Sequence, residues 1–95
     1  MSDEYAGPAT LRVADRDLAV RVEVSGRFEP HDGRFHWGGR IAPEPPLAGI
    51  VRAGTRAATL SVPGGEPVPA RLGEPDPWGG VRVTGVGRPP WAPLP

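Results

Sequence analysis

The sequence contains no cysteine and no lysine, and each absence excludes a class of chemistry. Without cysteine the chain forms no disulfide, no thiolate zinc site and no thiol nucleophile, which suits a reducing compartment. Without lysine it has no side-chain amine for a Schiff base. All eleven basic residues are arginine. Arginine binds carboxylates and phosphates in a bidentate manner, but the codon preference of a GC-rich genome explains the bias more simply.

The chain also lacks net charge and long apolar runs. Eleven basic and eleven acidic residues balance to zero, so no overall field attracts nucleic acid or an anionic membrane. The N-terminus, M-S-D-E-Y-A-G-P, has neither the basic segment nor the apolar stretch of a signal peptide, and no apolar run approaches the length of a membrane span. We therefore expect residues 1–95 to form a single cytoplasmic domain that binds neither nucleic acid nor membrane.

Glycine and proline are abundant instead, with fourteen of each, but the order of the residues indicates a folded β protein. In residues 18–25, L-A-V-R-V-E-V-S, apolar residues alternate with small or polar ones, which is the period of a strand with one buried face. A shorter alternation at residues 10–13 precedes it, and the A-D-R-D between the two supplies turn formers. Residues 9–25 are therefore predicted to form a hairpin.

Four further segments bounded by glycine, proline or acidic residues have the composition of strands: residues 35–41, 57–62, 68–72 and 80–86. Six strands at this spacing predict an all-β fold, a small antiparallel six-stranded barrel or sandwich. At most one short helical turn is expected, near residues 46–53, with extended tails at 1–6 and 89–95. Pro67 and Pro69 lack N–H groups on the same side, which predicts that the fifth strand is a sheet edge.

Residues 29–33, E-P-H-D-G, are predicted to form a tight turn between two strands. Pro30 fixes φ at the first corner, and Asp32 can accept hydrogen bonds from nearby backbone N–H groups. Gly33 can take the left-handed conformation that the turn requires. The turn alone therefore accounts for much of the density of polar residues at this point.

The strand after this turn has two chemically different faces. Phe35 and Trp37 share one face, while His36 and Arg40 share the other. If the aromatic rings fill the core, His36 faces solvent or a partner. If the barrel holds a pocket, His36 and Arg40 line it instead.

Three chemical interpretations of this region compete. Glu29, His31 and His36 offer ligands for a divalent metal, but their spacing matches no established motif, so we expect no metal. His36 can act as a general acid or base near neutral pH, oriented by Asp32 or Glu29. The simplest interpretation is a structural turn whose histidines bond to backbone or water. His36 is thus the only catalytic candidate.

A second dense stretch, residues 72–91, contains E-P-D-P followed by Trp78. The two prolines of this motif predict an extended loop with few hydrogen bonds. Trp78 at its end is interpreted as a lid or a plug for the open end of a barrel, or as a ligand contact.

The glycines that follow form neither a Rossmann fingerprint nor a P-loop, because no helix follows them. We expect no flavin, nicotinamide or other cofactor to bind this chain. The proline-rich tail is expected to dock on the barrel through Trp91.

Both stretches resemble a known family. G-R-F-E-P-H-D-G-R-F-H-W-G-G-R at residues 26–40, L-G-E-P-D-P-W-G-G-V-R-V-T-G-V-G-R-P-P at 72–90, and Y-A-G-P-A-T-L-R-V near the start are similar to an uncharacterised actinobacterial domain family. Its members are about as long as this chain, and some are fused to flavin-dependent monooxygenases. Gly38 departs from the family pattern, where an aromatic residue is expected. The resemblance implies a link to oxidative metabolism and identifies no catalytic residue.

Two classes of function follow. The first is a non-catalytic β module that binds a small apolar or carboxylate-bearing molecule, or docks on an oxidoreductase such as a flavin monooxygenase. Its candidate contacts are Phe35, His36, Trp37, Arg40 and Trp78. The second is a small cofactor-free enzyme, a cyclase or isomerase that uses the barrel interior as a chamber and His36 as acid or base. The first is preferred, and the predicted edge strand also leads us to expect a homodimer.

Overall fold

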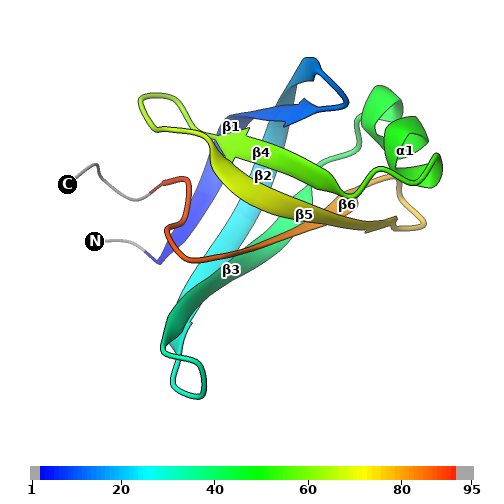
Figure 1. The fold of residues 1–95 in the computed structure, drawn as a ribbon. Coiled ribbons are helices and arrows are strands. Elements are labelled where there is room, and N and C mark those ends of the chain that lie inside the picture. Colours follow the sequence, from blue (N-terminus) through cyan, green and yellow to red (C-terminus); the bar gives the residue numbers. More distant parts are fainter. Residues whose placement is uncertain (1–2, 92–95) are drawn as a thin grey trace.

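The computed structural model describes residues 3–91 and contains six strands and one helix. The elements are β1 (Glu4–Val13), β2 (Arg16–Glu29), β3 (Arg34–Ile41), α1 (Pro45–Arg52), β4 (Ala57–Ser61), β5 (Val68–Pro75) and β6 (Val81–Val86). Every pairing is antiparallel, and the strands close into a barrel in the order β1-β2-β3-β6-β5-β4 (Figure 1). The predicted all-β fold class is confirmed, in its barrel form.

Tight turns connect the strands, and the first two lie where the sequence predicted them. Ala14 and Asp15 join β1 to β2 with φ values of 52° and 61°, the left-handed conformation of a two-residue hairpin loop. Residues 30–33 join β2 to β3, and Gly33 has a φ of 68°. The P-G-G of residues 63–65 lies in the turn between β4 and β5.

The prediction that β5 is an edge strand is wrong. β5 lies between β4 and β6, because pairing of β1 with β4 closes the sheet. Pro69 lies opposite Thr59 of β4, whereas pairing with β6 begins only at Arg71. At the proline, β5 therefore has a single neighbouring strand, and its missing N–H group does not prevent closure.

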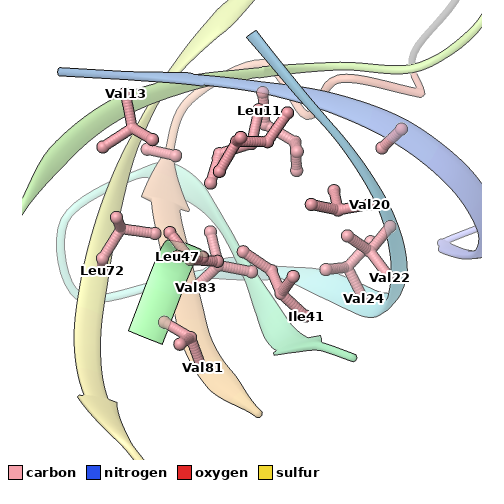
Figure 2. Close-up of a cluster of buried hydrophobic side chains, with 14 of the residues drawn as sticks. Leu11, Val13, Val20, Val22, Val24, Ile41, Leu47, Leu72, Val81 and Val83 are labelled. Atoms are coloured by element: carbon pink, nitrogen blue, oxygen red, sulfur yellow. The ribbon is translucent and has the colours of Figure 1, made fainter. Parts of the chain in front are cut away.

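Aliphatic side chains fill the interior of the barrel (Figure 2). The inward positions of the strands alternate with exposed ones, and Leu11, Ile41, Leu60 and Val83 are completely buried. Among residues 3–91, no polar or charged residue is buried. The interior is thus an apolar core, and any polar site on the described residues lies on the outside.

The short helical segment expected near residues 46–53 is the eight-residue helix α1. It begins with two prolines, whose missing N–H groups cost little in the first turn. Leu47 and Val51 are buried in the core cluster, so the helix covers one end of the barrel (Figure 1). Arg56 donates from Nη1 to the carbonyl oxygen of Val51 at 2.9 Å, and the same carbonyl accepts the backbone N–H of Gly54 at 2.9 Å, so this last-turn carbonyl has two donors.

The hairpin of β2 and β3 projects beyond the barrel at the other end (Figure 1). Pairing of β2 with β1 stops at Ser25, and pairing of β3 with β6 stops at His36. Residues 27–29 therefore pair only with residues 34–36 of the same hairpin.

The expected tails are partly strand and partly loop. Residues 4–6 belong to β1 and pair with residues 23–25. The ring centroid of Trp91 lies 6.1 Å from that of Trp37, in an edge-to-face contact, as expected for a tail that docks on the barrel. Residues 1–2 and 92–95 of the tails lie outside the described residues. No helix in the described chain is long and apolar enough to cross a membrane.

Candidate functional site

The five residues proposed as ligand contacts do not form one site. Phe35 and Trp37 point to the inner face of β3, where Trp37 is buried and Phe35 packs against the core. His36 and Arg40 lie on the outer face of β3, about 13 Å apart from the usual rise per strand residue. Trp78 lies in the loop between β5 and β6. The alternation predicted the faces correctly, and it follows that any site using His36 lies outside the barrel.

His36 pairs with Asp32 at the tip of the projecting hairpin. The Nε2 atom of His36 lies 2.7 Å from Oδ2 of Asp32, and Oδ1 of Asp32 accepts the backbone N–H of Arg34 at 2.9 Å. The hydrogen bond from His36 lowers the pKa of Asp32, and the backbone bond adds to this effect. Glu29, the other predicted partner, is bound by Arg27 instead. The imidazole is about a third exposed, so the pair is accessible to solvent on the outer face of the barrel.

Arg40 is bound to the loop between β5 and β6. Its Nε donates to Oδ2 of Asp76 at 2.6 Å, and its Nη2 donates to Oδ1 at 3.2 Å, which makes a bidentate ion pair. This bond lowers the pKa of Asp76 to about 2 and raises the pKa of Arg40. A Cβ atom added to Gly80 would lie 2.4 Å from the guanidinium, which shows how closely Arg40 packs on this loop. Its charge is therefore already matched within the protein.

Asp76 organises the whole loop. Its Oδ1 accepts the backbone N–H groups of Trp78 at 2.9 Å and of Gly80 at 3.0 Å. Its own backbone N–H donates to the carbonyl of Gly80 at 2.8 Å, and its carbonyl accepts from Gly79 at 3.0 Å. Sequence reasoning missed this role. An aspartate at the start of a turn commonly accepts backbone N–H groups a few residues later, and the position of Asp76 before Trp78 and Gly80 was the signal that could have predicted this loop.

Trp78 is presented to solvent by this loop. Its relative exposure is 78%, the highest among the exposed large apolar residues of the described chain. The interior is filled by other side chains and α1 covers the nearby end, so Trp78 does not plug the barrel (Figure 1). Trp78 thus faces solvent on a loop whose backbone is held by the hydrogen bonds of Asp76.

The metal interpretation of Glu29, His31 and His36 finds no support in the geometry. No three metal-binding side chains come together within residues 3–91.

Trp37, on the inner face of β3, has a structural role: it is only 3% exposed, and its indole lies against Gly85. The Nε1 atom of Trp37 is buried and has no hydrogen-bond partner in the described chain.

Comparison with known proteins identifies the family. Residues 2–92 match the family model described as "Domain of unknown function (DUF4873)". The chain belongs to this family. The DUF4873 match covers nearly the whole chain and confirms the resemblance to an uncharacterised domain family.

Relatives of this DUF4873 chain occur in mycobacteria. It is 44% identical over 88 residues to an uncharacterized protein of Mycobacterium bovis and equally similar to one of Mycobacterium tuberculosis. The aligned region is 93% of this chain but 25% of each relative, so the chain spans about a quarter of their length. No solved structure matches the chain.

Proposed function

We propose that the chain is a non-catalytic β module that docks on a larger protein, with Trp78 as the central contact. The 78% exposure of Trp78 is the observation that supports this most directly. A tryptophan side chain buries roughly 150–250 Å² when a partner covers it. Tryptophan is also enriched among the residues that dominate binding energy at protein interfaces.

The loop that carries Trp78 is organised before any partner arrives. Asp76 fixes the backbone of Trp78 and Gly80, and Arg40 of β3 holds Asp76 in turn. Pro75 and Pro77 restrict the backbone on both sides of Asp76. Binding therefore requires little further ordering of this loop, which removes one of the costs of association.

The chemistry of the described residues favours docking over catalysis. The barrel interior is apolar and contains no buried polar residue among residues 3–91. The polar clusters at His36 and Arg40 lie about 13 Å apart along β3, and each of these residues already pairs with a carboxylate.

A flavin-dependent monooxygenase is the partner that we propose. The sequence resembles a family with members fused to such enzymes, which supports an oxygenase over other partners. The mycobacterial relatives carry the matching segment within chains about four times as long. This supports a module that acts together with other protein domains.

The test is calorimetric titration of the purified chain with a flavin-dependent monooxygenase of the same organism. Trp78→Ala should weaken binding by at least about 30-fold, as expected for a central interface tryptophan. Phe28→Ala is the matched control, because Phe28 is also exposed, at 61%, but lies on the hairpin at the other end. If Phe28→Ala weakens binding and Trp78→Ala does not, the docking surface is misplaced. No binding at all would reject the oxygenase as partner.

A second candidate function is a cofactor-free enzyme, a cyclase or isomerase. The 2.7 Å contact between His36 and Asp32 is the observation that favours it, because a carboxylate commonly orients a catalytic imidazole. Such an enzyme would bind its substrate on the outer face. His36→Gln should then abolish turnover of the substrate, whereas a docking module would keep its affinity for the partner.

A further inference from the structure

We infer that the outer face of the barrel also holds a binding site for a small organic carboxylate, in a hollow centred on Gly38. Gly38 lies in the middle of β3, opposite Ser25 of β2 and Thr84 of β6. These two neighbours are exposed and share the outer face with His36 and Arg40. Because Gly38 has no side chain, the row from Ser25 to Thr84 has a gap at its centre.

The hollow is fixed by the backbone. A Cβ atom at Gly38 would lie 2.9 Å from the carbonyl oxygen of Val83 and 3.1 Å from Cγ2 of Thr84, so a side chain here would require β3 or β6 to shift. Two adjoining depressions meet over Gly38 and Ser25, with volumes of about 500 and 480 Å³. Volumes of this size lie within the usual range for small-molecule sites, roughly 300–1,000 Å³.

The depression between β2, β3 and β6 is basic. Arg27, His36 and Arg82 border it, with Glu29 as the carboxylate on its rim. Glu29 is bound by Arg27, which leaves Arg82 as the cation without an opposing charge. Arg82 forms no ion pair with any of the described residues.

The carboxylates on the other side of Arg82 are engaged elsewhere. Asp76 is held by Arg40, and Glu74 is bound by Arg56. On β5 the neighbour of Arg82 is Gly73, whose added Cβ would lie 3.3 Å from the Cβ of Arg82. Glu23 is the remaining carboxylate there, and it lies across β3 beside Arg40. The guanidinium of Arg82 is therefore available to an outside anion.

One end of the depression offers an apolar contact. Val86 is 51% exposed and lies four residues beyond Arg82 on the same strand, about 13 Å away. Thr84, between them, adds a methyl group and a hydroxyl group to the wall. A ligand with a carboxylate on Arg82 and a phenyl or short alkyl group toward Val86 matches this arrangement. A bare phosphate would use the cation but not the apolar surface.

This site is separate from the proposed docking surface, because Trp78 does not border the depression. The test is an NMR titration of the full chain, followed through its backbone amides. The probes are 3-phenylpropanoate, the neutral 3-phenylpropanol and inorganic phosphate. We expect 3-phenylpropanoate to shift the amides of Ser25, Gly38 and Thr84, and to bind at least tenfold more tightly than either other probe.

Variants separate the site from a general effect of charge. Arg82→Gln should weaken 3-phenylpropanoate binding about tenfold, in line with the loss of a charge-assisted hydrogen bond. Arg16→Gln is the matched control. Arg16 is exposed and has no ion pair within residues 3–91. It lies nine residues before Ser25 on β2, which is about 30 Å along the strand. Ser25→Phe, on the exposed face, should fill the hollow and abolish binding while the far-UV spectrum stays unchanged.

The inference is overturned by any of three results. Equal affinity of the alcohol or of phosphate, with shifts of the same amides, would remove the carboxylate or the apolar part of the claim. Equal weakening of binding by Arg82→Gln and Arg16→Gln would indicate a response to net charge alone. Shifts confined to residues outside the hollow would place the ligand elsewhere.

Discussion

Alanine substitution at two glycines should change stability in opposite directions. A Cβ atom at Gly85 of β6 would lie 2.3 Å from the indole of Trp37, whereas ordinary contacts begin near 3.4 Å. The indole would have to move by about 1.1 Å, the difference between these two distances. Trp37 is only 3% exposed and its ring is packed edge-to-face on Trp91, so it has little room to move.

The magnitude follows from two effects. Overfilling a packed core costs about 1–3 kcal/mol, and losing a favourable aromatic pair costs about 0.5–1.5 kcal/mol. Gly85→Ala should therefore lower the free energy of unfolding by about 1.5–4.5 kcal/mol, out of roughly 5–14 kcal/mol for a domain of this size. The near-ultraviolet circular dichroism of the tryptophans should change as well.

Gly49→Ala provides the control for this experiment. Gly49 lies on the exposed side of α1, and nothing lies within 4 Å of an added Cβ. Alanine is the better helix former, so this variant should gain about 0.5–1 kcal/mol. Urea unfolding followed by far-ultraviolet circular dichroism measures both changes. If Gly85→Ala is as stable as the wild type, Trp37 is not packed against β6 as described.

Two further predictions concern the core and the loop. Leu60→Ala should lower the free energy of unfolding by about 2–5 kcal/mol, because Leu60 is completely buried in the barrel; a loss below about 1 kcal/mol in urea unfolding would indicate a loosely filled interior. Asp76 has a folded-state pKa of about 2 against an ordinary 3.8, so the stability it contributes is present above pH 3.8 and is lost as the pH falls toward 2. In Asp76→Asn, the fall of the unfolding midpoint between pH 3.8 and 2 that Asp76 causes should disappear. If the midpoint of this variant depends on pH as that of the wild type does, other carboxylates cause the fall.

Local patterns were sufficient to predict most of the strands. Alternation along residues 18–25 predicted the buried face of β2, and the same rule placed His36 on the outside of β3. The turn at residues 29–33 followed from its proline, aspartate and glycine, and Asp32 accepts the backbone bond that this chemistry requires. These features depend on neighbours a few residues apart, which is why the sequence reveals them.

Closure and the loop site depend on contacts between distant residues. The barrel closes through Thr10 to Arg12 of β1 and residues 59–61 of β4, about fifty residues later. No local pattern predicts this pairing, and so β5 was wrongly interpreted as an edge. Arg40 and Asp76 are likewise 36 residues apart, and neither position alone indicates the other. Asp76 also accepts the backbone N–H of Trp78, so the conformation of the loop that carries Trp78 depends on this distant contact.

The position of Asp3 and Trp91 has a consequence for how genes can combine this fold with others. Asp3 bonds through its carbonyl to the backbone N–H of Gly26, Trp91 packs on Trp37, and Gly26 and Trp37 are opposite each other across β2 and β3. The first and last described residues therefore lie close together. A domain with this geometry can be inserted into a surface loop of another protein without separating the two ends of that loop.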